Sequence, residues 1–319
     1  MTLAVLVSLD GSDKDERAIA VARAFVELAD ADARVVHVFE TPALPGPPSV
    51  AALAAIESQH ETRDDLLRDV RDAAARLGAL VQRDVKSAVV DGSDVAETLL
   101  DYIETHDADF IVMATRAAGA LGRMMQGSVA DRLVRDSPRP VVLVPPRASY
   151  LGGKDVTLRR VLIPLDGSAA ALRVIPHLLE LPLAKQLEFV LLQAVQPERT
   201  GGYPMPPGMP QPSMQDLDDA EWTHVQTAVA EQRLEMVANR LRARGSHAEV
   251  RVIESEDPGA TIIDAVRNDL IELIAMSTRG ASGLQRLFLG SVAEYVVRRS
   301  EIPVLLVTAR SSPADALST

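Results

Sequence analysis

A glycine-rich segment near the end of the chain has the residues needed to bind a phosphate group. It reads MSTRGASGLQRLFLGSVAEYVVRR, Met276 to Arg299, and it follows the short apolar run DLIELIA. A helix that begins after Gly290-Ser291 would present free backbone N–H groups and a partial positive charge to the loop. Glycine lets a phosphate approach the backbone closely, and the Ser291 hydroxyl can donate to a phosphate oxygen. The simpler alternative is that Ser291 is an N-cap and that the glycines only allow a tight turn.

A turn that contains a carboxylate accompanies this loop. The residues LDGS, Leu165 to Ser168, end an apolar run that is typical of a buried strand. In doubly wound folds a carboxylate at such a position commonly holds a ribose hydroxyl, and ligands bind at the carboxyl ends of the strands. The loop and the turn are both predicted at those ends, so we expect them to share one site. A plain turn or N-cap role for Asp166 is the alternative.

The chain contains the same pattern twice. VLVSLDGS returns as VLIPLDGS, and MATRAAGALGRMMQGSVADRLVRD, Met113 to Asp136, returns as the glycine-rich segment. Asp10 matches Asp166 at an offset of 156 (166 minus 10), and Gly127 matches Gly290 at an offset of 163 (290 minus 127). Because offsets that stay constant over many residues rarely arise by chance, we interpret the chain as a duplication.

The duplication defines two domains, here called copy one and copy two. The change of offset places extra residues of copy two in the Pro- and Gly-rich stretch Pro197 to Ser213. We place copy one at residues 1–147 and copy two at residues 158–310, with a linker near Pro145 to Thr157. A length of 319 residues suits two domains.

Strand and helix signals alternate along each copy. In copy one, strands are expected at 3–9, 34–39, 85–90, 109–115 and 140–145, and helices at 13–29, 49–78, 94–106 and 128–136. This alternation predicts an α/β fold, two tandem doubly wound, Rossmann-like parallel sheets of about five strands each. Gly78 is expected to cap the long helix. An aromatic content of only 3% favours aliphatic cores, which suit parallel sheets covered on both faces.

Composition excludes several functions. The net charge is −12, which argues against nucleic acid as a partner. The chain has no cysteine, and its six histidines show no metal-ligand spacing, so we expect no metal site. No stretch has the roughly 20 apolar residues that cross a membrane, and the start lacks the features of a signal peptide. We therefore expect a cytoplasmic protein without a membrane partner.

The combined motifs resemble the universal stress protein family over nearly all of both copies. The resemblance rests on LDGS after a first strand, a VHV-type second strand, and Gly-x2-Gly-x9-Gly-[Ser/Thr] after the fourth. It implies that backbone N–H groups of the glycine motif bind the phosphates of ATP, with or without Mg²⁺. It also implies that the first-strand aspartate and the end of the second strand hold the ribose and adenine.

Transferred by position, the resemblance names two sets of binding residues. In copy two these are Asp166, Ala194, Ser277, Arg279, Gly280, Gly283, Gly290, Ser291 and Val292. In copy one they are Asp10, Val38, Gly127 and Ser128. We name no catalytic residue.

The two copies depart from the family's glycine pattern to different degrees. Copy two has Ser277 at the first of the three glycine positions, whereas copy one has Ala114 and Ala117 at the first two. If position 117 needs a left-handed backbone, its Cβ costs roughly 1–2 kcal/mol, and about 1.4 kcal/mol is tenfold in affinity. We therefore expect copy two to bind nucleotide more tightly.

These features favour a stress-response protein that binds ATP or another adenine nucleotide and signals to a protein partner that the sequence does not identify. Neither loop contains the lysine that anchors phosphates in fast phosphoryl transfer. A slow ATPase and a dimerisation module that has lost nucleotide binding are the alternatives.

The last strand of each copy is expected to join the two copies. The runs RPVVLVP and IPVLLVT are short and apolar, and the resemblance implies that they lie at the edge of the sheet. Exposed apolar edge strands pair readily with another strand. We expect antiparallel pairing of Val141–Val144 with Val304–Val307 about a pseudo-two-fold axis, and the sequence leaves a further homodimer open.

Overall fold

The structure is a computed structural model, and it describes most of the chain. The described residues are 2–12, 15–41, 50–115, 129–146, 148, 156–197, 219–278, 289–308 and 310–311, with backbone alone for 50–61 and 219–221.

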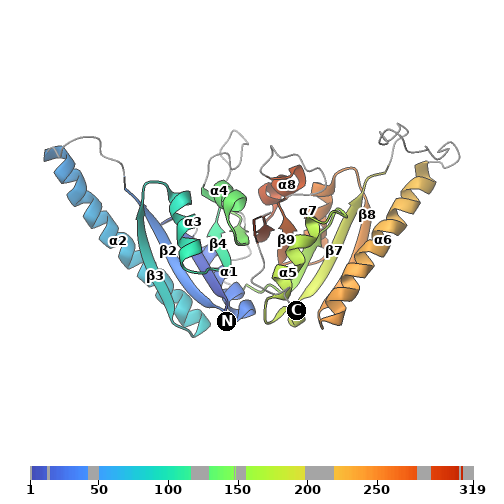
Figure 1. Ribbon diagram of the computed structural model, residues 1–319, viewed down its shortest axis with the longest axis horizontal. Coiled ribbons are helices and arrows are strands. Elements are labelled where there is room, and N and C mark those ends of the chain that lie inside the picture. The colour runs from blue at the N-terminus through green and yellow to red at the C-terminus, as the bar shows by residue number, and fades with distance from the viewer. Residues whose placement is uncertain are drawn as a thin grey trace.

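Ten strands form one sheet, shown in Figure 1. The strands of copy one are β1 (Ala4–Leu9), β2 (Asp32–Glu40), β3 (Val85–Gly92), β4 (Phe110–Ala114) and β5 (Val141–Val144). Those of copy two are β6 (Arg160–Pro164), β7 (Glu188–Val195), β8 (His247–Glu254), β9 (Leu273–Ser277) and β10 (Val304–Val307). Their order is β3-β2-β1-β4-β5-β10-β9-β6-β7-β8, and within each copy every neighbouring pair is parallel. The prediction of two tandem doubly wound sheets is confirmed.

Helices cover both faces of this sheet. One face carries α1 (Asp15–Ala29), α2 (Val50–Val81), α5 (Val174–Leu179) and α6 (Asp219–Ala243), and the other carries α3 (Val95–Thr105), α4 (Val129–Asp136), α7 (Pro258–Asn268) and α8 (Ser291–Arg299). Side chains alternate between the two faces along each strand, so every strand except β8 contributes to both cores. Each core contains strand residues of both copies and is built almost wholly from aliphatic side chains.

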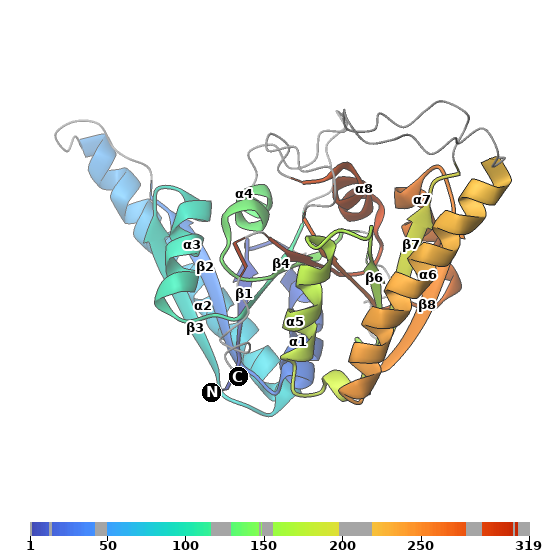
Figure 2. The ribbon, with the colours of Figure 1, turned by 45° about the vertical axis from the view of Figure 1, so that its right-hand side comes forward.

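The two copies meet through an antiparallel pair of strands. In β5 and β10, Val304 lies opposite Leu143 and Leu306 lies opposite Val141. All four residues of each strand are buried. The strand order read from β3 inward matches the order read from β8 inward, and Figure 2 shows the two halves spreading from this central pair. The predicted pairing of the last strands is confirmed.

Two local features differ from what the sequence suggests. Helix α2 continues past Gly78 to Val81, and the left-handed residue that follows is Gln82, with φ 54°. The Arg83 N–H donates to the Gly78 carbonyl over 3.1 Å, which is the long hydrogen bond of a Schellman ending. The prediction of Gly78 as the cap was therefore wrong. A Cβ at Gly78 would lie 2.8 Å from the Arg83 carbonyl oxygen, so glycine is needed there for close approach.

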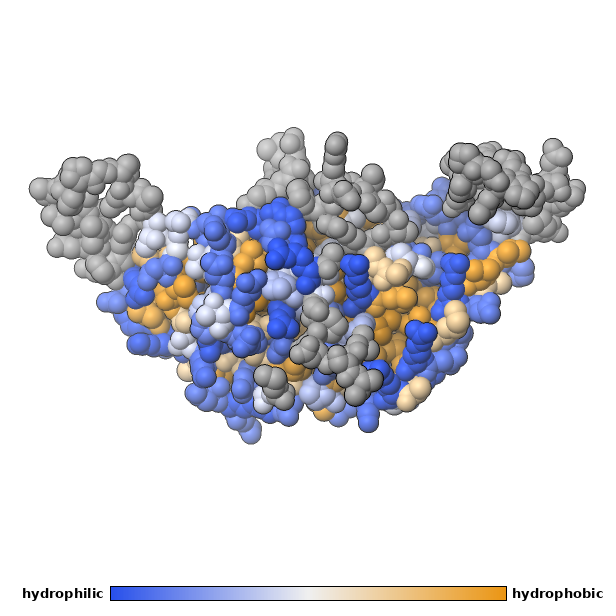
Figure 3. All heavy atoms as spheres, viewed as in Figure 1, coloured by the Kyte–Doolittle hydropathy of each residue, from blue (hydrophilic) through white to orange (hydrophobic). Residues whose placement is uncertain are grey.

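The helix that follows the first strand is much shorter in copy two. Helix α1 has 15 residues, whereas α5 has only six and follows a short 3₁₀ turn, Ala171–Arg173. The shorter α5 covers less of the sheet, and apolar side chains show on the surface near it (Figure 3). The apolar residues next to or in α5 that pack on the core but stay partly exposed include Leu172, Ile175 and Leu179.

None of the helices in the described residues combines the length and apolar character required to span a lipid bilayer.

His177 makes the stability of the fold depend on pH. Its side chain on α5 is only 3% exposed, and burial lowers its pKa from 6.5 to about 4, with the charge of Arg139 adding to this and the backbone of Ser311 opposing it. Between about pH 6.5 and 4 the unfolded chain therefore binds a proton that the folded chain does not. The free energy of unfolding must fall as the pH drops through this window.

We expect wild type to lose about 2 kcal/mol more stability than His177→Gln between pH 7.5 and pH 5, because this interval covers about 1.5 pKa units of the window and one pKa unit corresponds to about 1.4 kcal/mol. Urea unfolding of both proteins at pH 7.5 and pH 5 measures the difference, and other titrating groups affect both proteins alike. Equal losses in the two proteins would show that burial does not shift this histidine.

Candidate functional site

A pocket of about 280 Å³ opens at the carboxyl ends of the copy-two strands. Strands β6, β7 and β9 and the first turns of α7 and α8 enclose it. Its lining includes six of the residues expected from the sequence: Asp166, Ala194, Ser277, Gly290, Ser291 and Val292. The volume is close to the lower end, roughly 300 Å³, of small-molecule sites.

Asp166 is held in a tight turn directly after β6. Its Oδ1 accepts a hydrogen bond of 2.9 Å from the Ser168 N–H, and Gly167 between them has a left-handed backbone with φ 79°. The Ser168 hydroxyl oxygen then accepts from the Ala171 N–H over 3.1 Å. The local turn expected as the alternative for Asp166 is therefore present. It leaves the carboxylate exposed at the pocket, so the turn positions the group rather than burying it.

Gly290 is the residue before helix α8 and lies beside the end of β9. Its N–H donates to the Thr278 carbonyl over 2.9 Å, and its own carbonyl accepts from the Glu294 N–H over 2.9 Å. Gly290 is the N-cap residue, with extended φ and ψ of −62° and 150°. Ser291 is the first helical residue and not the N-cap that the simpler alternative assumed. The N–H groups of the first helical turn, at Ser291 and Val292, border the pocket without an acceptor in their own helix.

The remaining wall of the pocket is mostly apolar. These residues were not expected at the site from the sequence, and they are Pro164, Leu165, Ala171, Leu192, Pro258, Ile262, Met276, Thr278 and Ala293. Several are core residues that lie near the carboxyl end of a strand. Pro258 had a usable signal, because proline after an aspartate N-cap is typical of a helix start.

Some of the expected residues lie outside the described part of the chain. In copy two these are Arg279, Gly280 and Gly283, and in copy one Gly127 and Ser128.

The corresponding turn of copy one has a different electrostatic environment. Asp10 also accepts from the N–H two residues on, that of Ser12, over 3.1 Å. Here, however, the Asp15 carboxylate accepts from the N–H groups of Asp10 and Gly11 over 3.1 and 3.0 Å. Burial raises the pKa of Asp15 to about 6, and the charges of Asp10 and Glu16 add to the rise. Copy two has Ala171 at the position that matches Asp15.

The end of the second strand also differs between the copies. Val38 is buried and packs in the core beside α3, whereas the matching Ala194 is partly exposed and lines the copy-two pocket. His37 precedes Val38, and burial lowers its pKa, whereas copy two has the neutral amide of Gln193. At the end of the second strand, copy two has the small side chain of Ala194 where copy one has the larger Val38. After the first strand, copy one has a second carboxylate, Asp15, which copy two lacks.

No group of three or more His, Asp or Glu residues in the described ranges is arranged to hold a metal ion.

Comparison with known proteins places the chain in a family. The profile described as the Universal stress protein family matches residues 1–145 and again residues 157–308. A universal stress protein of Thermus aquaticus is 34% identical over 141 residues, which cover 44% of this chain and 96% of that protein. A universal stress protein of Mycolicibacterium smegmatis is 24% identical over 311 residues, which cover 96% of this chain and 97% of that protein.

Solved structures agree in fold. The crystal structure of a universal stress protein from Archaeoglobus fulgidus aligns with a TM-score of 0.64 at 19% identity, over 96% of each chain. Since the family profile covers both copies, this chain belongs to the universal stress protein family.

Proposed function

We propose that the chain is a stress-response protein that binds ATP in the copy-two pocket and that nucleotide occupancy sets a conformation read by a protein partner. The observation that carries the proposal is the convergence in one pocket of an exposed carboxylate, Asp166, and the free N–H groups at the start of α8. These are the two polar elements that a nucleotide needs, an acceptor for ribose hydroxyls and donors for phosphate oxygens.

Each part of the pocket has a separate role in the proposal. The N–H groups of Ser291 and Val292 and the positive end of the α8 dipole bind phosphate oxygens. Asp166 accepts a hydrogen bond from a ribose hydroxyl. The apolar wall that includes Ala194 and Ile262 packs against the base and keeps water from it.

A regulatory role fits this site better than fast catalysis. The described lining contains Asp166 as its single ionisable side chain, so no lysine or histidine is present there to stabilise a transferring phosphoryl group or to move a proton. The two loops contain arginines but no lysine.

The proposal assigns the nucleotide to copy two rather than to copy one. In copy one the ionised Asp15 would lie close to the phosphates or ribose, whereas copy two has the uncharged Ala171. Like charges at short range in a partly buried site oppose anion binding. This asymmetry adds to the loss of glycines in the copy-one loop.

Gly290→Val tests the phosphate contact. The φ of Gly290 is one that any residue adopts, so the fold should persist while the branched side chain fills the space beside the α8 N–H groups. We expect ATP affinity of the full chain, measured by isothermal titration, to fall by at least about tenfold, the loss of one charge-assisted contact. Gly127→Val is the matched control in copy one and should leave the affinity unchanged. An equal loss in both variants, or none in Gly290→Val, contradicts the assignment.

Asp166→Ala tests the ribose contact. We expect about tenfold weaker binding of ATP, because a hydrogen bond to a charged acceptor contributes about 1.5–3 kcal/mol. Asp166→Asn keeps an oxygen that can accept from the Ser168 N–H but removes the charge, so weaker binding in this variant reports the ligand contact and not the turn. Wild type should prefer ATP over 2′,3′-dideoxy-ATP, and Asp166→Ala should lose this preference. If the preference survives in Asp166→Ala, the carboxylate does not bind the ribose.

A further inference from the structure

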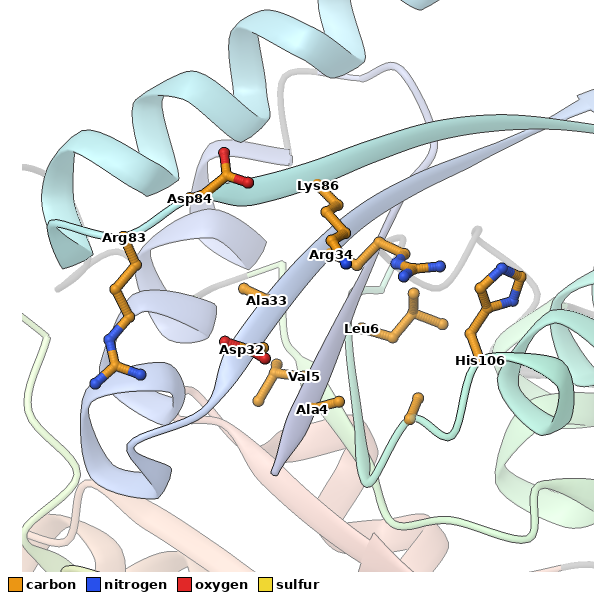
Figure 4. A pocket seen from close by; sticks show the side chains of 11 residues that line it. Ala4, Val5, Leu6, Asp32, Ala33, Arg34, Arg83, Asp84, Lys86 and His106 are labelled. Carbon is orange, nitrogen blue, oxygen red and sulfur yellow. The ribbon is translucent and has the colours of Figure 1, made fainter. Parts of the chain in front are cut away.

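A second and larger pocket lies in copy one, at the opposite ends of the strands. Its volume is about 550 Å³, and it opens at the amino ends of β1, β2 and β3, next to the end of α3 (Figure 4). The lining residues are Ala4, Val5, Leu6, Asp32, Ala33, Arg34, Arg83, Asp84, Lys86, His106 and Ala108. The nucleotide proposal uses none of them.

Strand register brings two cations of this pocket side by side. Leu6 pairs with Arg34, and Arg34 pairs with Lys86, so the three residues form one row across β1, β2 and β3. Residues of one row share a face of the sheet. In Figure 4 the side chains of Arg34 and Lys86 extend toward the same side, where His106 also lies. Helix α3 ends at Thr105, beside this row, in which Leu6 is buried and Lys86 is exposed.

Tyr102 holds two of the three basic groups in place. The Arg34 Nη1 donates to the Tyr102 hydroxyl over 3.1 Å, and its guanidinium lies 5.7 Å from the ring centre. The His106 ring stacks on the same tyrosine at 3.8 Å, and its Nδ1 lies 3.0 Å from the Tyr102 carbonyl oxygen. That contact leaves the His106 Nε2 for a ligand. Arg34 and His106 therefore have fixed positions before any ligand arrives.

Within the described residues, Arg34 and Lys86 form no ion pair. Arg83 differs, because it pairs with Asp30 and donates to the Ala31 carbonyl. The carboxylates of Asp32 and Asp84 lie toward the other end of the pocket in Figure 4. The pocket thus has a basic end, with two adjacent cations that pair with no carboxylate in the described part of the chain, and an acidic end.

Copy two shows that the fold does not require this basic group. The row that matches Leu6, Arg34 and Lys86 is Leu162, Val190 and Glu249, by the same strand pairings. The residue after α7 that matches His106 is Asp269.

On the matching surface of copy two, the charged side chains form ion pairs with one another. Arg251 contacts Glu249 over 2.8 Å and Asp269 over 2.7 Å. Copy two therefore shows that the fold is stable with an apolar residue and paired charges at these positions. Copy one instead carries Arg34, Lys86 and His106 around an open pocket.

We propose that this pocket of copy one binds a small phosphomonoester, with the phosphate group held by Arg34 and Lys86, and by the Nε2–H of His106 when its ring is protonated. A planar guanidinium offers paired donors to phosphate oxygens, and a lysine adds a compact charge. Asp32 and Asp84 repel a second anionic group at the other end. The body of the ligand is therefore uncharged or carries an amine.

The test uses glycerol 3-phosphate and the full chain, with binding followed by broadening of the ligand's ³¹P signal. Wild type and Gly290→Val should bind it equally, because the nucleotide pocket is not involved. R34V/K86E gives copy one the residues that copy two already tolerates in this row, and it should bind at least about tenfold more weakly, since charge-assisted contacts are lost. K86Q alone changes an exposed side chain and should give a smaller loss.

Two controls separate this site from other sources of the signal. Arg251→Gln, on the matching surface of copy two, should bind glycerol 3-phosphate like wild type. R34V/K86E should keep the wild-type affinity for ATP, which also reports an intact fold. The proposal is overturned if wild type does not bind the ligand, if R34V/K86E binds it as wild type does, or if Gly290→Val abolishes binding.

Discussion

The antiparallel pairing of β5 with β10 is the contact on which the rest of the structure depends. Four-residue strands with both faces buried cannot remain at an exposed sheet edge without pairing with another strand. Each copy supplies one such edge, and together they close the sheet at its centre. Side chains add to the joint, because the Thr308 hydroxyl donates to the Ser137 carbonyl of the other copy over 3.0 Å. Both cores therefore run through the whole chain.

The pairing of β5 with β10 lets the two copies differ in sequence at other positions. Because the central strands hold the sheet together, residues at the ends of the outer strands are free to change without loss of the fold. The turn after the first strand contains Asp15 in copy one and Ala171 in copy two. The row at the amino ends contains Arg34 in copy one and Val190 in copy two. In our account the copies share a scaffold and divide two ligand-binding roles, at opposite ends of their strands.

Much of the fold could be predicted from the sequence, because it depends on local patterns and on the repeat. Strand signals located the five strands of copy one, and the repeated offsets indicated that a second, similar set of strands exists in copy two. The central pairing followed from short apolar edges. The shortness of α5 was harder to see, since its residues still match those of α1 by position. Pro176 and Pro182 are the local signal, because proline interrupts a helix.

The sites were less predictable because they depend on register and on where helices stop. Asp166 follows a strand end and Gly290 precedes a helix at the same edge of the sheet, so their convergence could be expected. The apolar wall of that pocket could not, since Ile262 and Met276 look like any other core residues. The basic pocket was not predicted at all. Arg34, Lys86 and His106 are far apart in sequence, and only the pairing of β2 with β3 and the end of α3 bring them together.

The helix ending at Gly78 illustrates a different limit. Glycine near the end of a helix usually indicates its cap, but here the glycine is needed because a carbonyl oxygen approaches it closely. Gln82 takes the left-handed position instead. Both roles favour glycine, and the sequence does not distinguish between them.

A crystal structure of the full chain with a non-hydrolysable ATP analogue tests the central claim most directly. Our account predicts the analogue in copy two, with its phosphates at the N–H groups of Ser291 and Val292, its ribose at Asp166 and its base beside Ala194. The account is contradicted if the analogue occupies copy one while the copy-two pocket stays empty, or if neither copy binds it at saturating concentration.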